Sequence, residues 1–532
     1  MKKQYLLFVA ISIAFSVSAL SRASGPRVVD VLFKGAQLYD GGGNPWVAAD
    51  VGVAGGRISF IGHADVAGVT GKEVVDAHGL VLTPGFIDMH SHADLDDPEG
   101  RRMLPSLYQG ITTIVEGIDG DGTDAISKDF ARYRKNGIGV NVLRYVGFNA
   151  ARYAVMGMSD AAPTPAQLQG MKDYVERGMK AGAFGMSSGL FYVPAAYATT
   201  AEVIEVAKVS GRYHGIYDTH DRDLGAVYKG VGYLASTAEA IEIGEKSGNS
   251  IIFSHFSPQS VSNYGRAAEG AKLIEDARAR GVNVMAAQHA YTASNSNLLA
   301  YALPTWAVAG GDEAKLARFQ DPETRKRMQA EHEEMLKIRG GAEKLVFTDT
   351  DPELNGKSLA QVAREWGVSA FDATVRIASK RDLVEVENVG LYDQNNIDYL
   401  AQKEWMMTCT DGYPGHFGQG IVHPRAYGSF SLKLRSLVLD RHLITLPFAI
   451  RGMTGLAAEF LALPDRGLIK EGFRADLLLI DLKSLRDKAT YEKPHAYSEG
   501  MVDVMVNGRF EIRDHKPTEV LAGQPIERTR QD

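Results

Sequence analysis

Positions 84–92 read Pro84-Gly85-Phe86-Ile87-Asp88-Met89-His90-Ser91-His92, an apolar run that ends in two histidines one residue apart. If Phe86–His92 is a β-strand, alternate residues share one face, so the side chains of His90 and His92 converge. Two converging imidazoles can bind one metal ion, because neutral imidazole is a common metal ligand in proteins. The spacing alone is equally compatible with two ordinary hydrogen-bonded histidines.

Length and composition narrow the class of protein. The chain has 532 residues, more than one hydrophobic core usually holds, so we expect a large domain and a smaller one. It is 45% hydrophobic and 23% charged, as globular proteins are. A net charge of −7 without a block of like charge argues against a nucleic-acid partner. The single cysteine, Cys409, excludes an intrachain disulfide.

The first residues have the pattern of a secretory signal peptide. Lys2 and Lys3 precede an apolar run, Leu6–Leu20, and small residues follow it up to Ser24. The run is too short to favour a membrane anchor, so we assign residues 1–23 to a cleaved signal. We therefore expect an exported protein, periplasmic or secreted, with no membrane span after cleavage.

Both ends of the remaining chain are rich in short β-like runs separated by glycine turns. These runs occur between Val28 and Val81, and similar ones return at 475–480 and 501–506. Two β-rich ends around a different middle predict one small β-sandwich domain, built from residues 24–82 and 465–532.

The middle, residues 83–464, alternates strand-like and helix-like segments. Besides Phe86–His92, the strand candidates are Thr112–Val115, Val140–Val146, Gly185–Ser188, Ile216–His220, Ile251–His255, Val282–Ala287 and Trp405–Asp411. Repeated βα units of this kind favour a TIM-like (β/α)8 barrel in an α/β fold, with an open doubly wound sheet as the alternative. One helix candidate, Thr199–Arg212, begins with a capping-box pattern of Thr199 and Glu202.

Residues 294–403 are too long for one crossover between strands. The segment is charged and helix-prone around Pro322–Arg339. We expect an insertion over one end of the barrel that could serve as a substrate lid.

Candidate site residues stand at the C-terminal ends of the predicted strands. They are His90, His92, His220, His255 and Asp411. In a parallel barrel these ends gather on one face, where the active sites of such barrels lie. A metal held there can generate hydroxide near neutral pH, while a carboxylate accepts and returns its proton. The set predicts a hydrolytic metal centre.

These features resemble the amidohydrolase superfamily, and several segments are similar to the N-acyl-D-amino-acid deacylases (D-aminoacylases). The segments are Pro84–His92, Gln109–Thr113, Gly185–Tyr192, Pro194–Ala198, Tyr217–Arg222, Asp411–Gly412, His423–Arg425, Arg451–Gly455 and Asp487–His495. The resemblance covers nearly the whole chain after the predicted signal. It implies a metal-bearing barrel with a split β-sandwich.

The resemblance also implies ligands for one or two zinc ions. His220 and His255 would hold the tighter metal, and His90 and His92 would belong to a second site. Family members commonly carry a cysteine ligand after the second strand, where this chain has Asp119. A carboxylate is a harder anionic ligand than a thiolate and could bridge two metals. Glu116 is a nearby alternative, and Asp119 could also be a simple turn residue.

Further residues are implied for catalysis and substrate binding. Asp411 would be the general base that activates water and then protonates the leaving amine. Arg425 would pair with a free carboxylate of the small-molecule substrate, a contact suited to a planar guanidinium. Tyr192 is a candidate for polarising the scissile carbonyl, with aromatic packing as the alternative. His289 stands where the family usually has tyrosine; it could be a metal ligand, a substrate contact or neither, and of these we favour a substrate contact.

Two other features bear on the site. The family's lysine after the last histidine is replaced by Phe256-Ser257-Pro258, which puts substrate preference in question. Asp88 shares the predicted face of His90 and could orient that histidine.

The resemblance therefore implies a metal-dependent hydrolase of the amide bond in N-acyl-D-amino acids or related dipeptides that contain a D-amino acid. A dipeptidase or cyclic-amide hydrolase of the same superfamily is the nearest alternative. Such enzymes often use a carboxylated lysine, and no lysine stands at a predicted strand end; Lys180 lies in a helix-like stretch. An ester or lactone hydrolase, or a non-catalytic protein that binds a metal or a small acid, is the remaining alternative.

Overall fold

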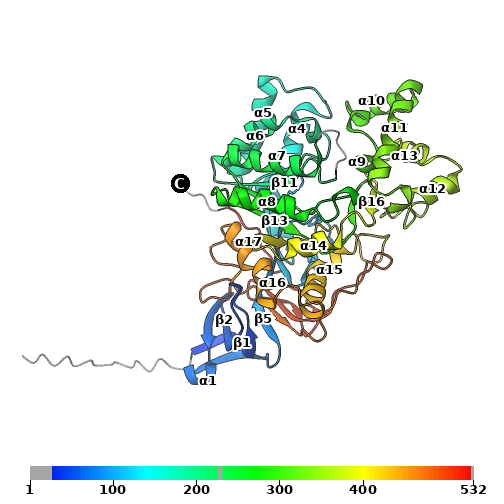
Figure 1. The fold of residues 1–532 in the computed structure, drawn as a ribbon. Helices are drawn as coiled ribbons and strands as arrows, with labels where there is room; N and C mark the ends of the chain where they lie inside the picture. The colour runs from blue at the N-terminus through cyan, green and yellow to red at the C-terminus, as the bar shows by residue number, and fades with distance from the viewer. Residues whose placement is uncertain (1–26, 226–230, 529–532) are drawn as a thin grey trace, which may run out of the picture.

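The structure is a computed structural model that describes residues 27–225 and 231–528 (Figure 1). The predicted signal peptide, residues 1–23, lies outside the described residues. Within the described ranges, no helix is both long enough and apolar enough to cross a membrane.

The small domain is one large sheet that joins the two ends of the chain. Its strands are β1 (Arg27–Leu38), β2 (Val47–Ala54), β3 (Arg57–Gly62), β4 (Val69–Asp76), β5 (Val81–Pro84), β18 (Leu477–Ile480), β19 (Met501–Val506), β20 (Arg509–Arg513) and β21 (Lys516–Pro517). Antiparallel pairing of β5 with β18 places Leu82 opposite Leu479. Val51, Leu477 and Met505 pack in its core, so apolar residues from both ends of the chain stabilise it.

The large domain is a ring of parallel strands. They are β6 (Phe86–Asp88), β7 (Ile111–Glu116), β8 (Asn141–Arg144), β9 (Val146–Gly147), β10 (Gly185–Gly189), β11 (Ile216–His220), β12 (Ser250–Phe253), β13 (Val284–Gln288) and β17 (Met406–Thr408). The order is β6-β7-β8 and then β9-β10-β11-β12-β13-β17. Nearly all their residues are buried, because helices cover the outside of the ring.

Two junctions close the ring. β8 continues into β9 through Tyr145, so the predicted strand Val140–Val146 is interrupted only at that residue. At the other junction, Met89 N donates to Thr408 O at 3.4 Å and Asp411 N donates to His90 O at 2.9 Å. The (β/α)8 barrel with a β-rich domain is thereby confirmed, and the alternative of an open sheet is wrong.

Helices surround the barrel, as Figure 1 shows. The main ones are α3 (Ile126–Asn136), α4 (Phe148–Met156), α5 (Pro165–Lys180), α6 (Thr200–Gly211), α7 (Gly232–Ser247), α8 (Ala267–Ala279), α14 (Gln394–Ala401), α15 (Arg425–Leu432), α16 (Leu446–Met453) and α17 (Gly455–Phe460). At the start of α6, Thr199 accepts a hydrogen bond from the Glu202 backbone. The Glu202 carboxylate instead pairs with the fully buried Arg152 at 3.0 Å, so only half of the predicted capping box forms.

The predicted insertion forms a separate lobe beside the barrel mouth, coloured yellow-green in Figure 1. It contains the three-stranded sheet β14 (Ser294–Asn297), β16 (Glu385–Asn388) and β15 (Leu345–Phe347), with α9 (Leu298–Ala302), α10 (Asp312–Gln320), α11 (Pro322–Ile338), α12 (Leu359–Trp366) and α13 (Ala370–Ala378). Its apolar residues form two cores, one around Phe371 and one around Phe347 that also includes Phe191 of the barrel. The chain then returns to the barrel through α14, which packs on α8.

The barrel and the small domain share one continuous hydrophobic core. Val81, Leu478 and Val504 of the sheet pack in the same cluster as Phe86 and Ile114 of the barrel. The boundaries at residues 82 and 465 therefore stay predictions, because no break in packing marks them.

Candidate metal centre and substrate cavity

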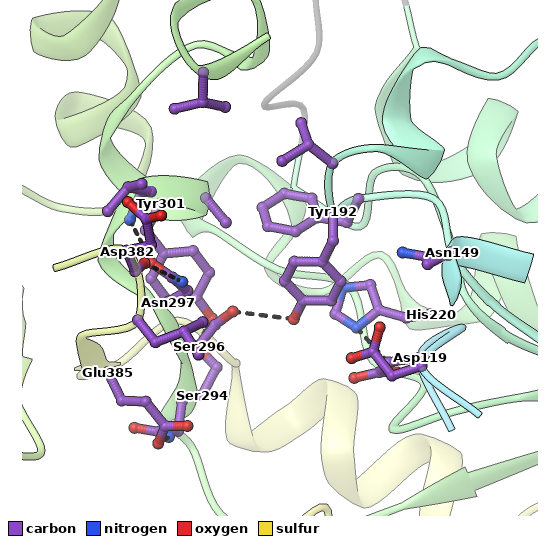
Figure 2. A pocket seen from close by; sticks show the side chains of 18 of the residues that line it. Asp119, Asn149, Tyr192, His220, Ser294, Ser296, Asn297, Tyr301, Asp382 and Glu385 are labelled. Atoms are coloured by element: carbon purple, nitrogen blue, oxygen red, sulfur yellow. Dashed lines mark hydrogen bonds and ion pairs between the residues drawn. The ribbon is translucent and has the colours of Figure 1, made fainter. Parts of the chain in front are cut away.

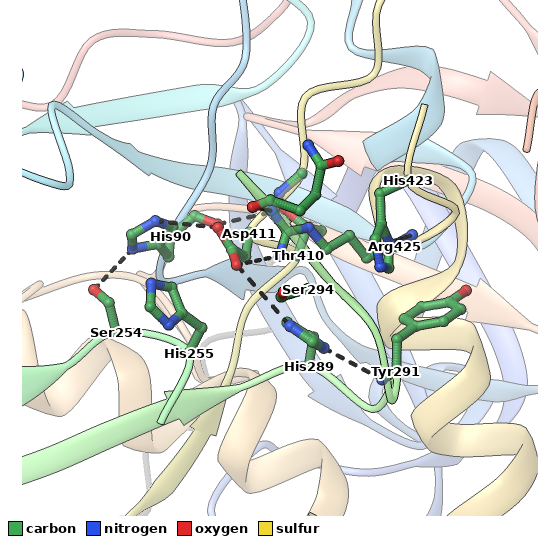
Figure 3. Close-up of polar contacts among 12 residues, drawn as sticks. His90, Ser254, His255, His289, Tyr291, Ser294, Thr410, Asp411, His423 and Arg425 are labelled. Atoms are coloured by element: carbon green, nitrogen blue, oxygen red, sulfur yellow. Dashed lines mark hydrogen bonds and ion pairs between the residues drawn. The ribbon is translucent and has the colours of Figure 1, made fainter. Parts of the chain in front are cut away.

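Six predicted site residues converge where the barrel strands end. His90 and His92 follow β6, Asp119 follows β7, His220 ends β11, His255 follows β12 and Asp411 follows β17. Figure 3 shows His90, His255 and Asp411 pointing toward one another from separate segments. Their convergence follows from the parallel barrel, which gathers the carboxyl ends of all strands on one face.

Most of these residues lie beyond their strands and not within them. β6 ends at Asp88, so the prediction that His90 and His92 belong to a strand is wrong, although their rings lie 5.1 Å apart. The backbones of Asp119, His255 and Asp411 have positive φ angles of 54°, 37° and 51°. Such conformations are uncommon outside glycine and concentrate at functional sites, where surrounding contacts hold them.

Asp119 stands between the two histidine pairs. Its Oδ1 lies 3.5 Å from His90 Nε2, 3.7 Å from His220 Nδ1 and 4.0 Å from His255 Nε2. Its Oδ2 lies 3.7 Å from His92 Nε2. One carboxylate thus faces both predicted metal sites, as a bridging ligand does.

Asp411 contacts the second histidine pair and a cation. Its Oδ1 lies 3.2 Å from His92 Nε2 and 3.5 Å from His90 Nε2, and the guanidinium of Arg425 donates to its Oδ2. Burial opposes ionisation of Asp411, but the charges of Arg425 and His255 outweigh it and hold the pKa well below its usual range. Asp411 is therefore a carboxylate at neutral pH.

The residues fit a zinc ion. Three sets of three ligands each bring their ligand atoms within 4.8 Å of one another: His90, His92 and Asp119; His90, His255 and Asp411; and Asp119, His220 and His255. His90 Nε2, Asp119 Oδ1 and His220 Nδ1 are buried without a hydrogen-bond partner, which is costly unless a cation binds them. Burial and the neighbouring His255 lower the pKa of His220 to about 3, so its ring is neutral, as a ligand must be.

Glu116, the alternative ligand, does not join this centre. Its Oε2 lies 3.6 Å from Arg144 Nε and accepts a hydrogen bond from Tyr133 at 3.5 Å. Burial raises its pKa to about 7. Asp88 accepts hydrogen bonds from the Thr410 backbone and hydroxyl at 2.9 and 2.5 Å and from the His90 backbone N–H at 3.2 Å. It therefore holds the backbone of His90 and of the Asp411 loop, and its contact with the histidine is to the backbone and not to the ring.

A cavity of about 770 Å³ opens beside the six residues. The lobe supplies one wall through residues 294–297, Tyr301 and Glu385, as Figure 2 shows in part. Across the cavity, the Tyr192 hydroxyl is hydrogen-bonded to Ser296 Oγ at 3.0 Å, and its ring lies 4.7 Å from that of His220. Tyr192 therefore links the metal centre to the lobe.

Arg425 is the cation that lines the cavity next to the metal ligands. It is 4% exposed and also contacts the Asn295 carbonyl at 3.4 Å. Lys315, the other cation among the described lining residues, pairs with Asp312 and Asp382.

His289 and Lys180 do not line the cavity. His289 Nε2 lies 4.0 Å from Asp411 Oδ2, and its contact with a substrate stays a prediction. Burial and Arg425 lower the pKa of His289 to about 3, so it is a neutral neighbour of Asp411. Lys180 is paired with Glu176 on the exposed side of α5 and is no candidate for a carboxylated ligand.

Two residues that were not predicted, Ser254 and Asp218, support the site. Ser254 Oγ is hydrogen-bonded to His90 Nδ1 at 2.8 Å and donates to Asp218 Oδ1 at 2.5 Å. One signal was available, because Asp218 precedes His220 by two residues on β11 and so shares its face.

Comparison with known proteins agrees with this geometry. Residues 73–511 match the model of an amidohydrolase family. An N-acyl-D-aspartate deacylase of Alcaligenes xylosoxydans xylosoxydans is 32% identical over 91% of this chain and 92% of its own length. A D-aminoacylase of the same organism is 32% identical over 95% of this chain and 99% of its own length.

Solved structures extend the comparison to three dimensions. The N-acyl-D-glutamate deacylase of Bordetella bronchiseptica, solved with zinc and a phosphonate that mimics the tetrahedral intermediate, has a TM-score of 0.79 at 28% identity. The match covers 94% of this chain and 100% of that one. A D-hydantoinase from a Bacillus species, at 15% identity and a TM-score of 0.56, shares the fold. The chain therefore belongs to the amidohydrolase family and, within it, to the group of the N-acyl-D-amino-acid deacylases.

Proposed function

We propose that this protein hydrolyses the amide bond of N-acyl-D-amino acids, or of dipeptides ending in a D-residue, to a carboxylic acid and a free D-amino acid. The observation that carries the proposal is the placement of Arg425 in the cavity beside four histidines and two aspartates. An amide bound through its carboxylate at Arg425 lies next to the metal ligands. The preference for D-residues rests on the relatives, whose names specify D-aspartate and D-glutamate.

The proposed cofactor is zinc. His220, His255 and Asp119 would hold one ion, and His90 and His92 would share Asp119 for a second. When bound, zinc supplies Lewis acidity that polarises a carbonyl oxygen and lowers the pKa of water.

Asp411 is the proposed general base. It accepts a proton from the attacking water and delivers it to the departing nitrogen, so that a neutral amine leaves. In the structure Arg425 neutralises Asp411. A substrate carboxylate would share that guanidinium, which makes Asp411 more basic when substrate is bound.

Tyr192 is proposed to orient the scissile carbonyl. Its hydroxyl lies in the cavity and is held by Ser296. A fixed donor aimed at an oxygen that becomes negative stabilises the transition state more than the ground state.

The test is a substrate screen on zinc-loaded protein. N-acetyl-D- and N-acetyl-L-amino acids, dipeptides with a D-residue at the C-terminus, hydantoins and simple esters are compared by kcat/KM. We expect turnover of the D-amides and at least about 100-fold less with the L-amides, and we expect the Asp411→Asn variant to be inactive. Turnover confined to hydantoins, esters or L-substrates contradicts the proposal.

We also propose that the protein is exported. The support is the pattern of Lys2, Lys3 and the apolar run Leu6–Leu20. Fractionation of the expressing cell and N-terminal sequencing of the mature protein test it. A cytoplasmic protein that keeps its first residues contradicts this proposal and leaves the hydrolase proposal untouched.

A further inference from the structure

One of the four metal-centre histidines, His90, has a hydrogen-bond partner on the ring nitrogen that faces away from the metal centre. The His90 ring presents Nε2 to Asp119 and Asp411, while its Nδ1 is hydrogen-bonded to Ser254 Oγ at 2.8 Å (Figure 3). By contrast, His255 Nδ1 is buried without a partner. The contact therefore distinguishes His90 from His255 and is not a general feature of the site.

The direction of this contact follows from counting protons. A serine hydroxyl has one proton, and Ser254 donates it to Asp218 Oδ1 at 2.5 Å. With Asp218 ionised, its oxygens can only accept hydrogen bonds. Ser254 Oγ then accepts from His90, which places the ring proton on Nδ1.

That proton position leaves a lone pair on His90 Nε2, the atom that faces Asp119 and Asp411. A histidine ligand needs this arrangement, and a partner on the distal nitrogen fixes the tautomer and the ring orientation. All three groups are fully or almost fully buried, with His90 and Asp218 at 0% and Ser254 at 2% exposure. Water therefore cannot readily replace Ser254 as the acceptor.

We infer that Ser254 and Asp218 are positioning residues that preset His90 to bind the second of the two proposed zinc ions. Asp119, which faces both histidine pairs, supplies the shared anionic ligand. The inference rests on the metal centre of the proposed function, but it concerns the binding of the second ion and not the reaction.

Metal counting tests the inference separately from activity. The full-length protein is loaded with zinc, dialysed against metal-free buffer, and its zinc counted by mass spectrometry, with affinities measured by chelator competition. We expect two zinc ions in the unmodified protein. In Ser254→Ala and Asp218→Asn we expect one, with the second ion bound about 10–100-fold more weakly and the first unchanged.

Two further variants separate positioning from packing. Ser257→Ala removes a nearby buried hydroxyl that has no hydrogen-bond partner, so it should keep both ions. Ser254→Thr retains the hydroxyl and should also keep both. Retention of the first zinc and an unchanged melting temperature of the metal-free protein exclude misfolding as the cause of the loss.

Specific outcomes overturn the inference. If the affinity of Ser254→Ala for the second zinc is within about threefold of that of the unmodified protein, Ser254 and Asp218 do not position His90. If the unmodified protein holds one ion only, the two-zinc assignment is wrong. Hydrolysis of D-amides by a one-zinc enzyme would leave the proposed function standing, whereas two tightly bound ions without hydrolysis would leave this inference standing.

Discussion

Arg425 donates a buried hydrogen bond to Asp411, so the cation proposed to bind the substrate already neutralises the carboxylate proposed to take the proton. Neither residue is more than 5% exposed. A buried ion pair is sensitive to the loss of one partner, because the remaining charge is left uncompensated. In the proposed reaction, substrate binding and proton transfer would therefore be coupled through one guanidinium.

Removal of Arg425 should weaken substrate binding. Arg425→Gln is expected to lower kcat/KM for an N-acetyl-D-amino acid by about 100-fold or more, because it deletes a buried charge contact worth about 2–5 kcal/mol. Most of the loss should appear in KM. Arg425→Lys keeps the charge but lacks the planar guanidinium, so its kcat/KM should lie between those of the unmodified protein and Arg425→Gln. Steady-state kinetics decide, and an unchanged KM in Arg425→Gln would assign carboxylate binding to another residue.

Restoring the family's cysteine should change the metal centre. Asp119→Cys is expected to keep the ion at His220 and His255 and to favour soft metals such as cadmium, because thiolate is a softer ligand. The second ion should be lost, since Asp119 reaches His92 with one oxygen and His220 with the other. Zinc and cadmium titrations followed by metal counting check this expectation.

The control for that experiment lies two residues further on. Asp121 lines the cavity but belongs to none of the three ligand sets. Asp121→Asn should therefore leave both the metal count and the metal preference unchanged. Equal loss of metal in both variants would show that the loop, and not the Asp119 carboxylate, controls binding.

The fold and most of the ligand set could be predicted because both follow from strand patterns. Apolar runs that end in His220, His255 or Asp411 repeat at the spacing of βα units, and a parallel barrel brings such ends together. These inferences needed only the position of each residue along its strand.

The remaining details depend on loop conformation and three-dimensional packing. The positive φ angle of Asp119 turns its carboxylate toward the histidines, whereas Glu116 turns to Arg144, and no residue pattern distinguishes the two. The position of His289 beside Asp411 and outside the cavity lining likewise depends on packing. The contact between Ser254 and His90 joins residues 164 positions apart, so strand spacing could not reveal it.

Tyr192 should matter through its hydroxyl. Tyr192→Phe keeps the ring against His220 and removes the hydroxyl, and we expect kcat to fall about 10–100-fold with little change in KM. Ser296→Ala removes the partner that holds this hydroxyl and should reduce kcat by less than about tenfold. If both variants retain full kcat, Tyr192 only packs against the metal centre.

A buried glutamate far from the metal centre should make stability fall at alkaline pH. Glu511 of β20 is 2% exposed and accepts a hydrogen bond from the Ala522 backbone. Burial raises the pKa of Glu511 to about 8, from 4.5 for an unperturbed glutamate. Between these values the folded chain holds a proton that the unfolded chain has released, so the free energy of unfolding falls as pH rises through this window.

Glu511→Gln should remove that pH dependence. Glutamine keeps the acceptor for Ala522 and carries no charge, so the variant should match the unmodified protein at pH 5 and exceed it by about 1–3 kcal/mol at pH 8–9. Chemical denaturation of both zinc-loaded proteins at pH 5, 7 and 9 measures the difference. Parallel stability curves across this range would mean that Glu511 ionises normally in the folded protein, and a loss of stability at every pH would mean that the charged carboxylate itself is needed.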